Sequence, residues 1–258
     1  MTSRVAVVTG ASRGIGRAIA LALGADGWSV AVGFRSGEGE AKDVASEIEE
    51  AGGRAITLAL DTSDEARIGE AFKEAADALG PVTGLVNNAG VSRDGLSVKY
   101  PTEEFDRTMA VNTRGAFLCS RAALRGMLRE RFGRIVNISS AVALNGNAGQ
   151  VAYAASKAAV VGMARSLARE VGSRGITVNV VCPGLVPALV PPPPPHAAAM
   201  NETRGIDMPS TVPRRMNSRR LMRPAAYSSM TWFSISFRCA RMASTRRCVS
   251  SMEAPFQD

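Results

Sequence analysis

The chain contains a single histidine, His196, among its 258 residues, and this scarcity excludes several kinds of site. A Ser-His-Asp hydrolase needs a histidine base, and zinc sites are built from several His or Cys ligands. The cysteines form no C-x-x-C pair. We therefore expect no metal, and we expect buried or free thiols instead of disulfides at Cys119, Cys182, Cys239 and Cys248.

Long apolar runs are also lacking. No uninterrupted stretch approaches the ~18 apolar residues of a membrane-spanning helix, and the first apolar run is too short for a signal peptide. We expect a soluble, cytoplasmic protein with no membrane partner. With 46% hydrophobic residues, a chain of this length can bury a full core as one domain.

The net charge of +8 is unevenly distributed. Residues 1–186 hold 21 Lys and Arg against 19 Asp and Glu, whereas residues 187–258 hold 10 against 4. Ten of the 13 prolines lie in the same last 72 residues, five of them in an unbroken run at 191–195 that cannot continue a helix or a central strand. We therefore predict a folded domain at 1–186 and an atypical Pro-, Arg- and Ser-rich tail at 187–258. The tail shows no aromatic interleaving, so we expect no nucleic-acid partner.

Helical periodicity and short apolar runs alternate along the first domain, which predicts an α/β fold. Such alternation requires parallel strands joined by right-handed crossovers, hence a doubly wound, Rossmann-like sheet with helices on both faces. Ligands of such sheets bind at the carboxyl ends of the strands. We expect helices at 14–25, 40–51, 64–78, 103–130 and 151–172, and strands at 4–9, 29–34, 55–60, 83–87, 133–139 and 176–182.

A glycine-rich turn joins the first strand to the first helix. An apolar strand at residues 5–8 leads into glycines at 10, 14 and 16, and an amphipathic helix follows. This arrangement is typical of a dinucleotide site, where backbone N–H groups and the helix dipole meet a pyrophosphate. The spacing G-x-x-x-G-x-G departs from the commoner G-x-G-x-x-G. A glycine-rich turn without a ligand is the alternative.

Tyr153 and Lys157 are four residues apart in Tyr-Ala-Ala-Ser-Lys, so on a helix they share one face. A neighbouring ammonium lowers the pKa of a tyrosine from its usual value of about 10 and favours the phenolate. The pair can then act as a general acid or base near neutral pH. Taken alone, the same spacing also fits an ordinary surface face.

Further motifs give a specific resemblance. Thr-Gly-Ala-Ser-Arg-Gly-Ile-Gly at 9–16 and Asn-Asn-Ala-Gly at 87–90 are joined by Asn112, Ser140, Tyr153 and Lys157. Together they resemble the motif set of the short-chain dehydrogenase/reductase family, over residues 1 to about 186. Within that family, the segments at 92–94, 146–150 and 173–176 resemble the 3-oxoacyl-[acyl-carrier-protein] reductases of fatty-acid synthesis.

The resemblance implies hydride transfer from a reduced nicotinamide to a ketone. In it Tyr153 donates the proton, and Lys157 lowers the tyrosine pKa and hydrogen-bonds the nicotinamide ribose. Ser140, favoured over its neighbour Ser139 by the family spacing, would stabilise the carbonyl oxygen. Asn112 would bend its helix and hold a water that leads protons to the lysine, unless it is a helix-surface asparagine. The resemblance also implies a homotetramer, if the tail permits one.

Cofactor choice depends on the end of the second strand, where an acid grips the ribose of NAD and a cation accepts the 2′-phosphate of NADP. Arg35 and Ser36 stand there, and Arg13 lies in the glycine loop, so we predict NADPH over NADH. The resemblance places Asp61 and Thr62 at the adenine. The expected cofactor-binding residues are Gly10, Ala11, Ser12, Arg13, Gly14, Ile15, Gly16, Arg35, Asp61, Thr62, Asn88, Ala89, Gly90, Tyr153, Lys157, Pro183, Gly184 and Val186.

An acyl-carrier-protein thioester is the partner that the resemblance implies. That carrier is acidic, so arginines near the mouth of the site are the expected docking points. Arg131 and Arg174 match the family's positions, although each can equally be a solvated cation at a helix end, and Arg93 is equally open. The alternatives are another short-chain ketoreductase, or a catalytically silent chain that only binds a dinucleotide.

The tail departs from the resemblance, because the substrate-loop helix and the closing strand with its Val-Asp-Gly-Gly signature are not visible. If residues 251–254 are read one nucleotide back, their codons can encode that signature, so we hypothesise a frameshifted C-terminus. A divergent natural tail is the alternative, and sequencing the coding DNA decides between them. The Phe-Ser-Ile-Ser-Phe alternation within residues 227–237 could pair as a stray strand.

Overall fold

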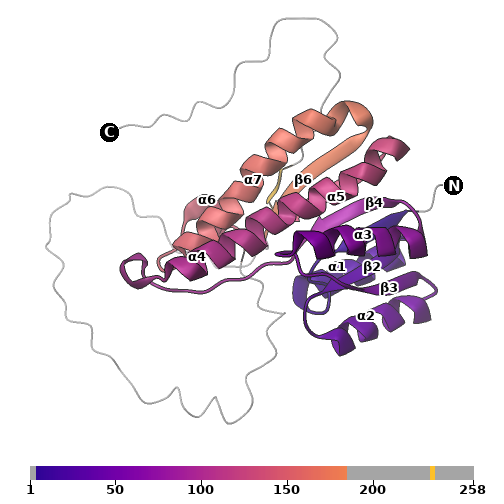
Figure 1. The fold of residues 1–258 in the computed structure, drawn as a ribbon, viewed down its shortest axis with the longest axis horizontal. Coiled ribbons are helices and arrows are strands. Elements are labelled where there is room, and N and C mark those ends of the chain that lie inside the picture. The colour runs from indigo at the N-terminus through magenta and orange to yellow at the C-terminus, as the bar shows by residue number, and fades with distance from the viewer. Residues whose placement is uncertain (1–3, 185–232, 236–258) are drawn as a thin grey trace, which may run out of the picture.

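The computed structural model describes residues 4–184 and 233–235, which build one sheet with helices on both faces (Figure 1). The strands pair in the order β3-β2-β1-β4-β5-β6-β7, and β1 to β6 all run parallel. The predicted doubly wound fold is therefore confirmed. The strands are β1 (Val5–Val8), β2 (Ser29–Phe34), β3 (Arg54–Ala59), β4 (Val82–Asn87), β5 (Gly133–Ile138), β6 (Ile176–Cys182) and β7 (Phe233–Ile235).

The expected helices are found except between residues 102 and 130, and the short helix α6 (Val142–Asn145) was not anticipated. Between residues 102 and 130 a single expected helix is interrupted by a π-helical turn, η2 (Ala110–Arg114). Two 3-10 turns, η1 (Ser97–Lys99) and η3 (Gly172–Arg174), were not anticipated. The α-helices are α1 (Gly14–Ala25), α2 (Glu38–Glu50), α3 (Glu65–Leu79), α4 (Thr102–Met109), α5 (Gly115–Glu130), α6 (Val142–Asn145) and α7 (Val151–Val171).

Two apolar cores lie on opposite faces of the sheet. Val7 faces the core that α3, α5 and α7 cover, with Met127 and Val161 among its members. Its neighbour Val8 faces the other core, where Ala20 of α1 and Ile48 of α2 pack. Because successive side chains of a strand point to opposite faces, a parallel strand covered on both sides must be apolar throughout. All four residues of β1 are accordingly buried.

The chain order places a crevice at the middle of the sheet. From β1 the strands add outward through β2 and β3, and the next strand, β4, then pairs on the other side of β1. The loops that leave β1 and β4 therefore diverge to opposite faces, and the carboxyl ends of these two strands border an opening between them. Ligands of doubly wound sheets bind at this position.

The far edge of the sheet is formed by β7, which pairs antiparallel with β6 and sets Val180 opposite Ile235. The predicted stray strand is thus confirmed for Phe233–Ile235. The remaining tail, the boundary at 186, His196, Cys239 and Cys248 lie outside the described residues.

Two further expectations concern described residues. Cys119 and Cys182 are buried free thiols, as predicted, and burial raises the pKa of Cys119 to about 12. Within residues 4–184 and 233–235, no helix combines the length and apolarity that a bilayer span needs.

Candidate active site

The glycine loop after β1 is shaped by positions that accept no side chain. Gly10 and Gly14 adopt φ of +64° and +60°, which only glycine reaches at low cost. A Cβ on Gly16 would lie 2.3 Å from the carbonyl oxygen of Gly10 and 2.5 Å from Nδ2 of Asn88. The loop therefore packs directly on α1, whose first turn opens into the crevice as a phosphate-binding helix start does.

A clasp of side-chain hydrogen bonds joins the ends of β1 and β4. The hydroxyl oxygen of Thr9 accepts bonds from the backbone N–H groups of Asn88 (3.0 Å) and Ala89 (2.9 Å). In return, Nδ2 of Asn88 donates to the carbonyl oxygens of Thr9 (2.9 Å) and Gly10 (3.0 Å). Asn88 was predicted to bind a cofactor ribose, but its amide nitrogen is engaged in holding the glycine loop.

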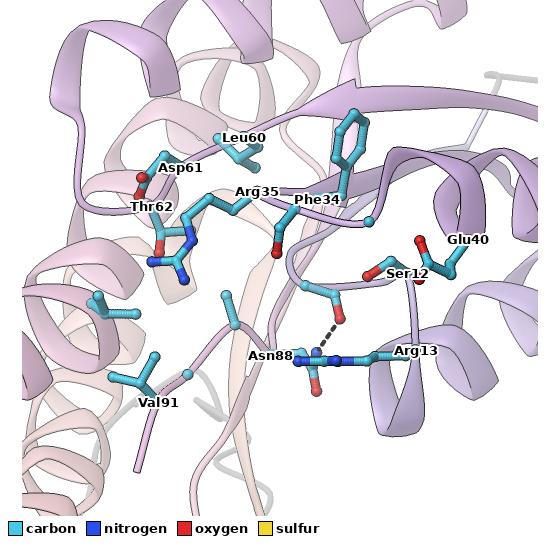
Figure 2. A pocket seen from close by; sticks show the side chains of 16 residues that line it. Ser12, Arg13, Phe34, Arg35, Glu40, Leu60, Asp61, Thr62, Asn88 and Val91 are labelled. Carbon is cyan, nitrogen blue, oxygen red and sulfur yellow. Dashed lines mark hydrogen bonds between the residues drawn. The ribbon is translucent and has the colours of Figure 1, made fainter. Parts of the chain in front are cut away.

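The first cavity at the crevice has a volume of about 390 Å³ (Figure 2). Arg35 extends from the end of β2 into its centre, and Arg13 lies along the opposite wall beside Asn88. Neither guanidinium forms a salt bridge within the described part of the chain. The lining residues are Gly10, Ser12, Arg13, Phe34, Arg35, Ser36, Gly37, Glu40, Leu60, Asp61, Thr62, Asn88, Ala89, Gly90, Val91 and Val111.

Asp61 is held as an anion at one wall of this cavity. Its Oδ1 accepts hydrogen bonds from the backbone N–H of Ser63 (2.9 Å) and from the Ser63 hydroxyl (2.6 Å). Burial by itself raises the pKa of Asp61, but the bonds from Ser63 and the charge of Arg35 outweigh it, so the pKa is lowered. The carboxylate and the Arg35 guanidinium therefore face the same space as opposite charges.

A second cavity of about 250 Å³ adjoins the first, with which it shares Asn88, Gly90 and Val91. It brings together three of the four predicted catalytic residues, Ser140, Tyr153 and Lys157. The complete lining is Ile15, Asn88, Gly90, Val91, Ser92, Ile138, Ser139, Ser140, Tyr153, Lys157, Pro183 and Gly184. The predicted Val186 lies outside the described residues.

Lys157 reaches from α7 to the end of β5. Its side chain is buried, and Nζ donates a hydrogen bond to the carbonyl oxygen of Ile138 (2.8 Å). Nζ lies 5.8 Å from the centroid of the Tyr153 ring. Burial disfavours the ammonium and lowers the pKa of Lys157 to about 8.

The prediction that Lys157 depresses the pKa of Tyr153 is wrong for the protein by itself. Burial raises the pKa of the phenol, and the hydrogen bond with Ser140 only partly opposes this shift. The physical reason is that Nζ is turned to the Ile138 carbonyl instead of to the phenol oxygen. Tyr153 is therefore protonated at neutral pH, as a proton donor must be.

The two adjacent serines after β5 have different surroundings. Ser139 is buried and its hydroxyl donates to the backbone carbonyl of Lys157 (2.8 Å), which ties β5 to α7. Ser140 has its hydroxyl oxygen at the start of α6, where it accepts a bond from the N–H of Val142 (3.2 Å), and it also interacts with the Tyr153 phenol. Of the two serines, Ser140 is the one whose hydroxyl lies beside the Tyr153 phenol, and its catalytic role stays a prediction.

Asn112 is not a helix-surface residue, because only 2% of it is exposed. Its Oδ1 accepts from the N–H of Val91 (2.8 Å), and its Nδ2 donates to the carbonyl of Val91 (2.9 Å) and the hydroxyl of Ser156 (3.0 Å). The residue sits in the π turn η2, so the expected local departure from α-helix is present. A Cβ on Gly90 would lie 3.3 Å from Oδ1 of Asn112 and 3.2 Å from Nζ of Lys157.

Arg131 and Arg174 do not lie near the mouth of this site within the chain. Arg131 ends α5 in a left-handed conformation, and both arginines precede the first residues of β5 and β6, which pair at Gly133 and Ile176. Ser140 follows the opposite end of β5, about 20 Å away at ~3.3 Å per residue. Within one chain the two arginines therefore lie at the amino ends of β5 and β6, away from the mouth at the carboxyl ends, and their docking role stays a prediction.

Arg93 lies in a further cavity beside the glycine loop, together with Arg13 and Arg107. Its Nη1 forms a salt bridge with Oε1 of Glu104 (2.9 Å), and Arg107 approaches Oε2 of the same carboxylate (3.7 Å). The charge of Arg93 is thus partly neutralised by the carboxylate of Glu104 on α4.

Comparison with known proteins agrees with this geometry. The family model described as short chain dehydrogenase matches residues 4–190. The chain belongs to this family. It is 41% identical over 186 residues to "3-oxoacyl-[acyl-carrier-protein] reductase" of Synechocystis sp., a match covering 72% of this chain and 75% of that protein. It is also 42% identical over 184 residues to the Staphylococcus aureus (strain Mu50) protein of that name, FabG, covering 71% of this chain and 75% of the relative. Membership of an oxidoreductase family was thus read correctly from the motifs.

The contacts that sequence reasoning missed connect distant segments. Thr9 was noted only as the end of a strand and the first residue of the glycine motif, and Ser156 and Glu40 were not singled out. Thr9 stands beside the glycine loop in the motif, which is a usable signal. Ser156 offers none, because its bond to Asn112 spans 44 residues.

Proposed function

We propose that the chain reduces the ketone of a 3-oxoacyl thioester, carried by an acyl carrier protein, to the 3-hydroxyacyl form with NADPH. The observation that carries this proposal is the convergence of Ser140, Tyr153 and Lys157 in a cavity that shares lining residues with the one at the glycine loop. The relatives named above are reductases of such carrier-bound substrates, which supports the thioester as substrate class.

The residues fit a reduced dinucleotide. The crevice offers a glycine loop that a Cβ at Gly16 would fill, a helix start, and two guanidiniums without salt-bridge partners among the described residues. We assign the pyrophosphate to the loop, and the adenosine end to the side of Asp61 and Thr62. The bound nicotinamide would supply the hydride, and the remaining steps belong to the protein.

Tyr153 gives its phenolic proton to the carbonyl oxygen of the substrate, because burial keeps the phenol protonated at neutral pH. The Ser140 hydroxyl donates a hydrogen bond to the same oxygen while negative charge develops on it. Lys157, held by Ile138, places a cation behind the phenol and can replace the lost proton. Asn112 holds Val91 and Ser156 in place around the lysine.

NADPH is proposed over NADH because Arg13 and Arg35 line the adenosine cavity. A guanidinium binds a phosphate with charge-assisted hydrogen bonds that a ribose hydroxyl cannot match. Arg35→Ala should weaken NADPH binding about tenfold and change NADH binding little, as measured by fluorescence titration. Equal loss for both cofactors would oppose the assignment. A homotetramer and a cytoplasmic location remain predictions.

The test of the proposed function is NADPH consumption by the full chain with an acetoacetyl thioester, beside a free ketone and the Tyr153→Phe variant. We expect turnover with the thioester, slower turnover with the free ketone, and loss of turnover without loss of NADPH binding in Tyr153→Phe. Preference for the free ketone would favour a different ketoreductase. Binding of NADPH with no oxidation would favour a silent chain, an outcome to which the atypical tail could lead.

A further inference from the structure

Glu40 is an acid in the cavity where the 2′-phosphate is proposed to bind. It lines the same cavity as Arg13 and Arg35, and Figure 2 shows its side chain beside Ser12. Oε2 of Glu40 lies 2.8 Å from the position that a Cβ on Gly37 would take, and the hydroxyl of Ser12 lies 3.6 Å from the same point. The carboxylate therefore stands at the junction of the glycine loop and the turn after Arg35.

No cation in the described part of the chain neutralises Glu40. The other acid of the same helical turn, Glu38, is paired with Lys42 at 2.8 Å, whereas Glu40 forms no salt bridge among the described residues. Arg13 and Arg35 line other parts of the cavity wall. A carboxylate in this position repels a phosphate, while it can accept hydrogen bonds from the hydroxyls of an unphosphorylated ribose.

We propose that Glu40 limits the preference of this chain for NADPH over NADH by opposing the 2′-phosphate that Arg13 and Arg35 attract. The inference rests on the proposed use of NADPH. The carboxylate occupies the N-terminal end of α2, which would otherwise offer its positive dipole end to the phosphate. Selectivity is then a balance between two arginines and one acid.

A purely structural role for Glu40 makes different predictions. With Gly37 as N-cap, Glu40 is the third residue of α2, the position from which Glu or Gln reaches back to the N-cap N–H. Glutamine serves this position as well as glutamate does. Glu40→Gln therefore keeps the capacity to cap the helix and removes only the charge.

The experiment measures dissociation constants of NADPH and NADH by fluorescence titration and calorimetry for the full chain and its variants. Glu40→Gln should bind NADPH about fivefold more tightly than the parent and NADH within about twofold of it, because a like charge beside the phosphate is removed. Raising the salt concentration should shrink this difference, since the repulsion is screened. Glu38→Gln, in the same helical turn, should leave the NADPH to NADH ratio unchanged.

Glu40→Lys provides a second variant, which adds a cation and should favour NADPH further. An unchanged NADPH to NADH ratio in both Glu40 variants, or the same change in Glu38→Gln, would overturn the inference. The dissociation constants of the parent protein for NADPH and NADH test the proposed use of NADPH separately from the role of Glu40. If it binds NADPH no more tightly than NADH, the NADPH assignment fails, while a selective gain in Glu40→Gln would still uphold the role of Glu40.

Discussion

The ammonium of Lys157 donates to the carbonyl oxygen of Ile138 at 2.8 Å, so the helix that carries Tyr153 is fastened to the last residue of β5. The next two residues along the chain are Ser139 and Ser140. Ser139 returns a bond from its hydroxyl to the Lys157 carbonyl (2.8 Å). This reciprocal pair of contacts sets the distance between the serine and the tyrosine of the site, and four predictions follow from it and from the glycine loop.

The two adjacent serines should separate chemistry from stability. Ser140→Ala should lower kcat by about 100-fold, because a donor to the developing oxyanion is lost, with little change in the free energy of unfolding. Ser139→Ala should cost about 1 kcal/mol of stability through the lost buried bond to α7. Steady-state kinetics and urea unfolding of both variants check the contrast. Similar kinetic losses in the two would mean that Ser140 is not specific to the chemistry.

Thr9 should matter through its hydroxyl alone. Thr9→Val keeps the shape of the side chain but leaves the N–H groups of Asn88 and Ala89 without their acceptor. We therefore expect the free energy of unfolding to fall by about 2 kcal/mol and NADPH binding to weaken. Thr9→Ser retains the oxygen and should remain close to the parent. Chemical unfolding with and without NADPH measures both effects. A Thr9→Val variant that is as stable as the parent and binds NADPH equally well would show that the Thr9 hydroxyl does not hold the two loops together.

Two glycines of the loop should respond differently to the same substitution. Gly16→Ala places a Cβ 2.3 Å from the Gly10 carbonyl oxygen, and only backbone movement can relieve that clash, so we expect more than about 3 kcal/mol of destabilisation. Gly14→Ala meets no atom within 4 Å and bears only the cost of positive φ, about 1 kcal/mol. Thermal unfolding of the two variants shows which of them is destabilised more. A larger loss of stability in Gly14→Ala than in Gly16→Ala would contradict the close approach of Gly16 to the Gly10 carbonyl oxygen.

The burial of Lys157 predicts a pH dependence of stability. In the unfolded chain its pKa is near the ordinary 10.5, and in the folded chain it is lowered to about 8. Between these values the unfolded state binds more protons, so stability rises with pH, and the cost of the buried charge is present in full below pH 8. Between pH 8 and 10.5 the free energy of unfolding of the parent should therefore rise by roughly 3 kcal/mol relative to that of Lys157→Met.

Urea unfolding at a series of pH values measures this difference, with Lys99→Met as the same change at an exposed site. The free energy of unfolding of the Lys99 variant should depend on pH in the same way as that of the parent. A difference between parent and Lys157→Met that stays constant with pH would show that the lysine is not buried as an ammonium.

Much of the fold could be predicted because it depends on local patterns. The apolar runs and the helical periodicity identified all six parallel strands and the main helices, with ends shifted by one or two residues. The interruption at Asn112 was harder to place. A π turn produces no break in composition, since it is stabilised by the bonds of Asn112 to Val91 and Ser156, which are distant along the chain.

By itself, the sequence determined the glycine loop, the helix that presents Tyr153 and Lys157 on one face, and the family. Each of these depends on residues within a few positions of one another, and helical or strand geometry carries that spacing into space. The tertiary structure alone decided the direction in which the pKa of Tyr153 shifts, the position of Arg131 far from the crevice, and the presence of the acid Glu40 in the cavity that Arg13 and Arg35 line. Burial and charge contacts depend on which segments meet, and that is settled only when the sheet is assembled.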